Sequence, residues 1–249
     1  MLEQERHKKI LQLLEERPVI RLQELIENIG ASESTIRRDL IELEHRKRLK
    51  RVHGGASRLQ GKLAESSMAE KTSKNLQEKQ SIGRLAASLV QPDDTIYLDA
   101  GSTVYEMIRH LPPAITVVTN GITHLDALLE AGCKTILTGG TAKPSTKALI
   151  GRGALSALAR YRFDKCFLGV NALHPEYGLT TPDEEEAAVK EMALSLSRES
   201  YALADPSKFF EVSFARFAEL DEVTVLSTHG SLETLQSFPE SLKRMVTSP

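Results

Sequence analysis

The chain has 249 residues, of which 41% are hydrophobic and 27% charged, and this length and composition suit a globular protein of two domains. No apolar run reaches the roughly 20 residues that cross a membrane, and the first residues carry charges of both signs, so we expect neither a membrane protein nor a secreted one but a cytoplasmic protein. The two cysteines, Cys133 and Cys166, lie far from any histidine cluster, which indicates buried thiols and leads us to expect no metal and no cofactor.

The net charge of −2 conceals an asymmetry along the chain. Residues 1–60 hold 13 Lys and Arg against 10 Asp and Glu, a balance of +3, so the remainder holds 19 against 24, a balance of −5. The stretch 45–64 contains several lysines and arginines and no acidic residue. A basic stretch of this kind is typical of a surface that contacts phosphate groups.

Three short helices are predicted in the first 45 residues. Apolar residues at helical spacing predict helices over 6–16 and 21–29, and Pro18 separates them. A glycine turn follows, Ser32 is a natural N-cap, and Glu33 opens a third helix with one apolar stripe. This order predicts a helix-turn-helix.

The third helix turns hydroxyls and guanidinium groups outward, because the step of about 100° per residue places them opposite the apolar stripe. Arginine can bind O6 and N7 of guanine with two hydrogen bonds, so Arg38 is our first candidate for contact with bases in a major groove. The alternative is a solvated helix on which Arg37 and Arg38 pair with nearby acids. Those acids are Glu33, Asp39 and Glu42.

Residues 50–56 predict a strand that runs into a glycine turn, which suits a small β-wing whose cations contact the DNA backbone. A head that binds protein or RNA remains a weaker alternative. The residues expected to contact DNA are Ser32, Ser34, Thr35, Arg37, Arg38, Lys50, Arg51 and His53.

The run SESTIRRDL at 32–40 and the run RVHGGA at 51–56 resemble the amino-terminal signature of the DeoR family of sugar-metabolism regulators. This resemblance implies a winged helix-turn-helix domain over 1–58 that binds double-stranded operator DNA. Within the family, residues 32–56 are most similar to members that repress fructose operons in Gram-positive bacteria.

The polar segment 59–77 has no apolar stripe and is expected to be a linker, followed by a second domain over 78–249. Short apolar runs alternate there with helical stretches, which predicts a Rossmann-like α/β fold with a parallel sheet buried on both faces. Such sheets bind ligands beyond the carboxyl ends of their strands. The expected strands are 95–98, 115–119, 135–138, 165–170, 201–204 and 223–227.

Glycine and polar residues follow four of these strands and suit a polyhydroxylated ligand. After the first strand, the loop 99–103 enters a helix at about Val104, where backbone N–H groups and hydroxyls could bind a phosphate. The alternative is an ordinary helix cap made by Ser102 or Thr103. The expected ligand contacts in these loops are Asp99, Gly101, Ser102, Thr103, Asn120, Gly139, Gly140 and Asn171.

Asp183, Glu186 and Lys190 share one helix face and could reach the same ligand, and Lys208 could be a second cation for a phosphate. The alternatives are an exposed, salt-bridged helix and a surface lysine. A different alternative is an active sugar-phosphate isomerase or deaminase that uses Asp183, Glu186 and Asp205 as catalytic carboxylates.

The sequences at 99–103, 118–120, 178–190 and 204–208 resemble the carboxy-terminal sensor pattern of the DeoR family. The resemblance implies a fold similar to ribose-5-phosphate isomerase and glucosamine-6-phosphate deaminase, and a phosphosugar effector. For a fructose operon the first candidate is fructose 1-phosphate, and its binding is expected to release a dimer or tetramer of the chain from DNA. One departure is Lys71, where the family often has arginine.

Overall fold

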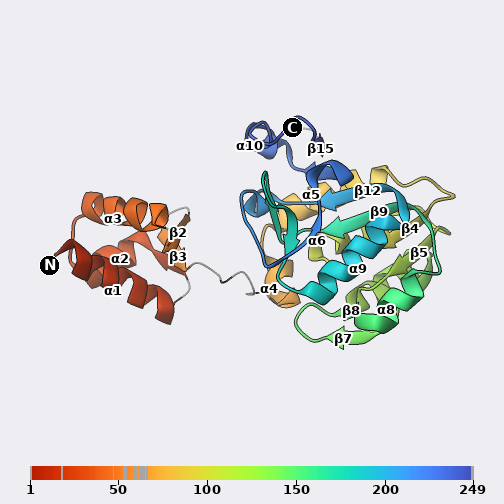
Figure 1. The fold of residues 1–249 in the computed structure, drawn as a ribbon, viewed down its shortest axis with the longest axis horizontal. Coiled ribbons are helices and arrows are strands. Elements are labelled where there is room, and N and C mark those ends of the chain that lie inside the picture. The colour runs from red at the N-terminus through yellow and green to blue at the C-terminus, as the bar shows by residue number, and fades with distance from the viewer. Residues whose placement is uncertain are drawn as a thin grey trace. The chain divides into compact units, whose positions relative to one another are not determined.

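The computed structural model describes residues 2–17, 19–46, 48–52, 55–58, 61, 65 and 67–247. The chain divides into two compact units, an amino-terminal unit of residues 1–61 and a larger unit of residues 62–249 (Figure 1). Within the segment expected as a linker, Met68–Ser73 form helix α4, and α5 begins at Leu76. None of the helices in the described ranges combines the length and the apolar character that a membrane span needs.

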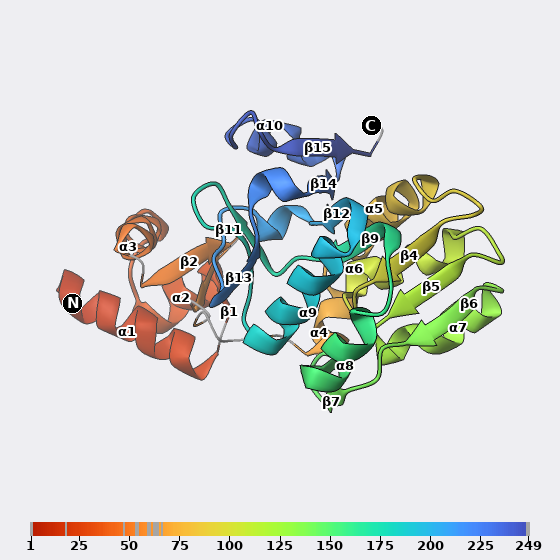
Figure 2. The ribbon, with the colours of Figure 1, turned by 45° about the vertical axis from the view of Figure 1, so that its right-hand side comes forward.

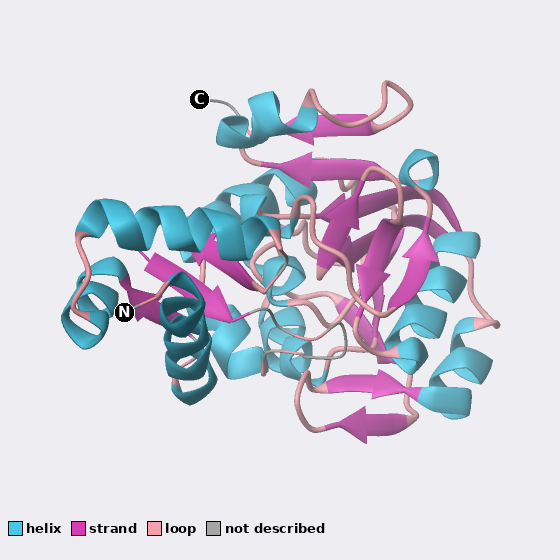
Figure 3. Ribbon diagram, turned by 60° about the vertical axis from the view of Figure 1, so that its left-hand side comes forward, coloured by secondary structure: helices cyan, strands magenta, loops and turns pink. Residues whose placement is uncertain are grey.

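The amino-terminal unit consists of three helices and a small antiparallel sheet of order β1-β3-β2 (Figure 3). The three expected helices and the expected strand of the wing are confirmed, the latter as β2. Its partner β3 was not predicted as a separate strand, nor was β1, because a strand of three residues shows no periodicity. His53, which is predicted to contact DNA, lies outside the described residues. The elements are α1 (Glu3–Glu16), β1 (Val19–Arg21), α2 (Leu22–Ile29), α3 (Glu33–His45), β2 (Leu49–Val52) and β3 (Gly55–Arg58).

This unit has a hydrophobic core of its own, to which every helix and the sheet contribute. A Cβ atom on Gly55 would lie 2.1 Å from the carbonyl oxygen of Ile20, so the close approach of β3 to β1 requires glycine there. The buried side chains of the core are Ile10, Leu14, Ile20, Leu25, Ile29, Ile36, Leu40, Leu43, Leu49 and Ala56.

The larger unit is built on a parallel sheet of seven strands in the order β15-β14-β12-β9-β4-β5-β6 (Figure 2). All six expected strands are present, which confirms the predicted fold class. The seventh, β15, is a short edge strand that was not predicted. The strands are β4 (Thr95–Leu98), β5 (Thr116–Thr119), β6 (Lys134–Leu137), β9 (Phe163–Gly169), β12 (Ser197–Leu203), β14 (Thr224–Ser227) and β15 (Lys243–Val246).

Helices cover both faces of this sheet, which explains why its central strands are apolar almost throughout. In β9, Cys166 packs into the core on one face with α8 and α9, and its neighbour Phe167 packs on the other with α5, α6 and α7. Cys133 is also a buried free thiol, as expected. The helices are α5 (Leu76–Ser88), α6 (Ser102–Tyr105), α7 (Leu125–Glu130), α8 (Gly151–Leu158) and α9 (Glu184–Ser195).

Smaller elements that were not predicted surround the sheet. A hairpin of β7 and β8 precedes α8, and an antiparallel sheet of order β10-β11-β13 follows β9. Most of these strands mix polar and apolar residues, so they lack the apolar run that marks the equally short buried strands of the main sheet. These elements are β7 (Thr141–Lys143), β8 (Ala148–Ile150), β10 (Ala172–His174), β11 (Gly178–Thr181), β13 (Ala215–Ala218) and the short helix α10 (Leu232–Leu235).

The strand order places a topological switch point between β4 and β9. From β4 the chain moves outward through β5 and β6, and then it returns to the other side of β4 with β9. The connections after β4 and β9 therefore leave toward opposite sides, and in open α/β sheets such a switch point is the usual place of a ligand-binding crevice. The carboxyl ends of β4 and β9 are therefore the candidate ligand site of this unit, which we call the switch-point crevice.

Candidate functional site

Helix α3 is fixed at its start by a local network of hydroxyls. The Oγ of Ser32, the N-cap residue, accepts a hydrogen bond from the backbone N–H of Thr35 over 3.3 Å. The same oxygen lies 2.8 Å from the Oγ1 of Thr35 and 3.1 Å from the Oγ of Ser34. Ser32 therefore has a structural function in the helix, in addition to its predicted function in DNA contact.

The two arginines on the outward face of α3 have different surroundings. Arg37 donates from Nε to Oε1 of Glu33 over 2.8 Å, and Glu42 pairs with Arg46. Arg38 is exposed and has no ion pair with any residue that the structure describes. The alternative of a solvated, paired helix therefore applies to Arg37, while Arg38 keeps its guanidinium available for a ligand.

A buried carboxylate on α3 links this helix to α1. Arg6 donates to Asp39 through both Nε and Nη2, over 2.7 and 2.9 Å, and Nε2 of His7 lies 3.3 Å from the same carboxylate. The hydrogen bond to Asp39 raises the pKa of the Arg6 guanidinium. A bidentate pair of this kind fixes the orientation of the helix as well as its position.

In the wing, Arg51 is tied back to α3. Its backbone N–H donates to Oε1 of Glu44 over 2.7 Å, and its Nη1 lies 3.8 Å from Oε2 of the same residue. Its side chain remains exposed, and Lys50 beside it is partly exposed. Both cations of the predicted wing contact are thus at the surface of the amino-terminal unit.

In the larger unit, a buried ion pair lies in the crevice at the switch point. Lys190 donates from α9 to Oδ2 of Asp99 and, over 3.1 Å, to the carbonyl oxygen of Gly169 at the end of β9. The backbone N–H of Gly169 donates to the same Oδ2 over 3.0 Å. Because Asp99 and Lys190 are 4% and 3% exposed, the alternative of a solvated helix does not hold for Lys190.

The loop after β4 enters α6 two residues earlier than expected, with Gly101 as the N-cap. Ser102 and Thr103 lie inside the first turn, and neither side chain caps the helix, so the alternative of an ordinary cap is wrong. Asn120 holds this loop in place, because its Oδ1 accepts from the N–H of Ala100 over 3.0 Å. The sequence-predicted residues of the first two strand ends are therefore brought together.

The other two strand ends contribute a glycine turn and an amide. Gly139 and Gly140 follow β6 with φ of 70° and 107°, and a Cβ atom on Gly140 would lie 2.5 Å from the carbonyl oxygen of Ile150. Asn171 follows β9 and accepts a hydrogen bond at Oδ1 from Thr181 over 3.0 Å.

The start of α9 carries a cluster that the sequence did not indicate, and we name it the Lys143 cluster. Nζ of Lys143 lies 2.5 Å from Oε2 of Glu65, 2.9 Å from Oδ2 of Asp183 and 3.1 Å from Oε1 of Glu186. Glu65 also accepts from Lys71 over 2.8 Å, so the lysine that replaces the family's arginine does make an ionic contact. The cluster consists of Glu65, Lys71, Lys143, Asp183 and Glu186.

The carboxylates of this cluster also have bonds of their own. Asp183 caps α9, accepting from the N–H groups of Glu185 and Glu186 over 2.9 and 3.0 Å. Glu186 is buried and accepts from Oγ1 of Thr146 over 2.6 Å. Although burial opposes it, the pKa of Asp183 is lowered by Lys143 and by the N–H groups that it caps. Both predicted carboxylates are therefore held in place before any ligand binds.

Lys79 of α5, which sequence reasoning missed, lies near the predicted residues of the loop after β12. Lys79 is buried, donates to the carbonyl oxygen of Lys71, and has its pKa lowered by burial. Asp205 is also buried; its Oδ1 accepts from Asn75 over 2.8 Å, while its Oδ2 has no hydrogen-bond partner among the described residues. Lys208 is partly exposed in the same loop. Lys79 could have been found, since it lies on the apolar face of α5.

His124 lies in the interior beside the loop after β5. Its Nδ1 is 3.3 Å from Oγ1 of Thr119, and its Nε2 has no partner among the described residues. Burial lowers the pKa of this imidazole to about 4. The side chain is therefore neutral at physiological pH.

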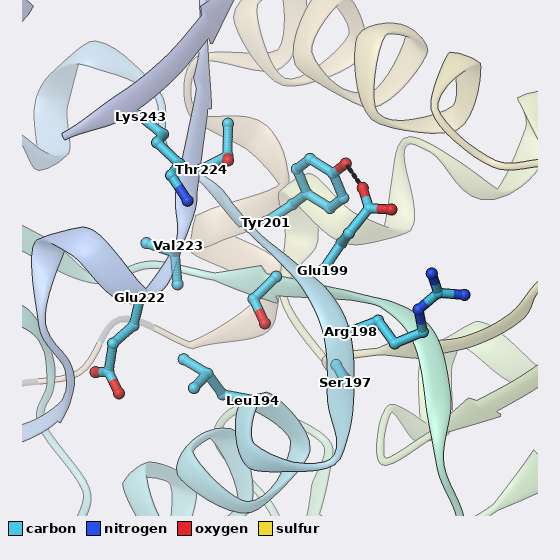
Figure 4. Close-up of a pocket in the computed structure, with 10 residues that line it drawn as sticks. Leu194, Ser197, Arg198, Glu199, Tyr201, Glu222, Val223, Thr224 and Lys243 are labelled. Atoms are coloured by element: carbon cyan, nitrogen blue, oxygen red, sulfur yellow. Dashed lines mark hydrogen bonds between the residues drawn. The ribbon is translucent and has the colours of Figure 1, made fainter. Parts of the chain in front are cut away.

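A pocket at the opposite edge of the sheet contains none of the predicted residues (Figure 4). It is lined by the amino-terminal parts of β12, β14 and β15, where Arg198, Glu222 and Lys243 contribute charged groups. Within it, Oη of Tyr201 donates to Glu199 over 2.5 Å. The carboxyl ends of β4 and β9 remain the better candidate for a ligand site, because Asp99 and Lys190 meet there and Asn120 holds the adjoining loop.

The comparisons with known proteins match both units. Residues 6–61 match the model of the DeoR-like helix-turn-helix domain, and residues 74–229 match that of the DeoR C terminal sensor domain. A relative from Bacillus subtilis (strain 168), the uncharacterized HTH-type transcriptional regulator FruR, is 47% identical over 100% of both chains. The lactose phosphotransferase system repressor of Staphylococcus aureus (strain N315) is 34% identical over 95% of this chain and 97% of its own. Among solved structures, ribose 5-phosphate isomerase A from Methanocaldococcus jannaschii is 17% identical, with a TM-score of 0.41 over 55% of each chain.

Proposed function

We infer that this chain, which belongs to the DeoR family of transcriptional regulators and is not an enzyme, represses a sugar-utilisation operon by binding duplex DNA through its amino-terminal unit. The observation that carries the DNA contact is the outward face of α3, where Arg38 is exposed and without an ion pair in the described part of the chain. We propose that Arg38 binds a guanine and that Ser34, Thr35 and Arg37 flank it in the major groove.

The cations of the wing fit a different contact. Lys50 and Arg51 lie on β2 at the surface, so we propose that they bind the phosphate backbone and orient α3 without reading the sequence. Binding through backbone phosphates weakens as salt increases, because the protein displaces condensed counterions.

We propose that the effector is a phosphorylated sugar bound in the crevice between β4 and β9. The backbone around Ser102 and Thr103, together with Lys208, supplies groups for the phosphate. At the carboxyl ends of the strands, carboxylates can accept hydrogen bonds from sugar hydroxyls, and amide groups can accept or donate them. The Oδ2 of Asp205, which has no partner among the described residues, adds an acceptor to the predicted set. These proposed ligand contacts are Asp99, Asn120, Gly139, Gly140, Asn171, Asp183, Glu186 and Lys190.

The first effector to test is fructose 1-phosphate, a choice supported by the resemblance of residues 32–56 to fructose-operon members of the family. A homo-oligomer that places two copies of α3 on repeated half-sites fits the geometry of helix-turn-helix proteins. The relative named as a repressor of a lactose phosphotransferase system supports control of a sugar operon.

A gel-shift assay tests this proposal with the full chain, a fragment of its own fructose-operon promoter and random duplex of equal length at moderate salt. We expect tighter binding to the promoter, and release when fructose 1-phosphate is added; fructose 6-phosphate, ribose 5-phosphate and free fructose serve as comparisons. Equal affinity for both duplexes would contradict the DNA contact. An unchanged shift with every sugar phosphate would contradict the effector.

A further inference from the structure

The Lys143 cluster joins the point where the chain enters the larger unit to the start of α9. On the entry side, Glu65 is one of the first described residues after the division at residue 61, and its side chain is buried. It is bonded to Lys71 of α4 and to Lys143. The N–H of Met68 donates to the carbonyl oxygen of Ser145 over 2.8 Å, so the entering segment is bonded to the β7–β8 hairpin twice.

The same hairpin is bonded to the proposed effector residues. Lys143 contacts Asp183 and Glu186, and Thr146 donates to Glu186. Helix α9, which begins after Asp183, carries Lys190 into the crevice at the switch point. The side chain of Lys143 contacts both Glu65 and the carboxylates at the start of α9, so a displacement of those carboxylates changes the contact with Glu65.

The charge balance of the cluster allows Lys143 to exchange one carboxylate partner for another. It contains two lysines and three carboxylates, so one carboxylate charge is left over and Lys143 is shared among three acceptors. Burial lowers the pKa of the Lys143 amine, but Glu65 and Asp183 outweigh it and raise that pKa, so the amine stays charged. A ligand hydroxyl that binds Asp183 or Glu186 competes with Lys143 for these oxygens, and a phosphate attracts Lys143 itself.

We propose that Lys143 couples the effector site to the DNA-binding unit by holding Glu65 in the effector-free chain, and that a phosphosugar bound against Asp183 and Glu186 loosens this hold. The inference rests on the proposed function, and it deepens it by naming the residues that transmit the signal. Glu65 and Lys71 are positioning residues in this scheme, since they act on the entering segment and not on the ligand.

The test measures operator affinity and effector affinity separately in the full-length chain. In the wild type, saturating fructose 1-phosphate is expected to weaken operator binding by about 5-fold to 150-fold, the usual range of allosteric coupling. Glu65→Gln removes one charge of the cluster and mimics the effector. Its operator affinity without ligand should fall by a comparable factor, and fructose 1-phosphate should change it by less than about 2-fold. Calorimetric titration should show effector affinity equal to or higher than that of the wild type, because the variant no longer holds the effector-free state.

Two further variants separate this result from a folding defect. Lys71→Gln weakens the hold on Glu65 without touching Asp183 or Glu186, so it should shift operator affinity in the same direction by a smaller factor. Glu219→Gln is the matched control, because it removes an ion pair with Arg216 away from the cluster, and it should behave as the wild type.

A full effector response in both Glu65→Gln and Lys71→Gln, with unchanged operator affinity, would overturn the inference while leaving the proposed function in place. Loss of effector binding in Glu65→Gln would also overturn it, because Glu65 would then be part of the ligand site. If the wild type binds operator DNA but responds to no sugar phosphate, the proposed effector and this inference fail together.

Discussion

Acidification should destabilise the larger unit through His124, whose imidazole is completely buried. Burial lowers its pKa to about 4 in the folded chain, while the unfolded chain has the ordinary value of 6.5. Between these two values the unfolded chain binds more protons, so stability is fully present above about pH 6.5 and is lost as the pH falls toward about 4. The difference amounts to about 2 kcal/mol at about pH 5 and about 3 kcal/mol once both states are protonated.

Urea unfolding of the wild type and of His124→Phe, at about pH 7.5 and about pH 5, measures this contribution. Phenylalanine can keep the ring contact with Tyr105, whose centroid lies 5.8 Å away, and it removes the polar ring nitrogens, including the one bonded to Thr119. The other titrating groups are the same in both proteins, so their effect cancels in the comparison. Between the two pH values, the free energy of unfolding should fall by about 2 kcal/mol more in the wild type than in the variant. Equal losses in the two proteins would refute the reasoning, since His124 could then not be the group that binds the proton.

Three other predictions concern the two units separately. Arg38→Ala should cost about 1–3 kcal/mol of binding to the preferred operator and much less on random duplex, whereas Arg51→Ala should weaken both equally and lower the salt dependence; fluorescence anisotropy with both duplexes decides this. Lys190→Met leaves a buried carboxylate without its cation and should lower the free energy of unfolding by about 3–5 kcal/mol, measured in urea; a loss below about 1 kcal/mol would show that the pair is not buried in solution. Gly140→Ala should destabilise the chain by more than about 2 kcal/mol, because its Cβ would collide with a carbonyl oxygen, and Gly139→Ala by only about 1 kcal/mol; thermal unfolding of the two variants should give different midpoints.

The main features of the fold could be predicted because they have a local cause. Ser32 before Glu33 marks the start of α3, and runs such as 165–170 are apolar because both faces of their strand are buried. The strands that escaped prediction, β1, β15 and those of the small sheets, are about as short as most of the predicted strands, but most of them lack a continuous apolar run. Their pairing depends on neighbours that are distant in sequence, and no local pattern specifies that.

The candidate site, too, could be predicted only where its residues follow a local sequence pattern. The loop 99–103 and the residues of α9 could be found, because strand ends and helix spacing are readable from the sequence. The partner of each charge could not: Glu65 lies 78 residues from Lys143, and Asp99 lies 91 from Lys190. Lys79 is the intermediate case, since a lysine at the spacing of a buried stripe is itself a signal.

The separate core of the amino-terminal unit has a consequence for how such regulators diversify. Every buried member of that core comes from residues 10–56, so the free energy that maintains the shape of α3 is generated within the first 61 residues. Substitutions in the proposed effector site at the carboxyl ends of β4 and β9 leave these contacts intact. DNA recognition by the amino-terminal unit and ligand recognition by the larger unit can therefore change independently in evolution.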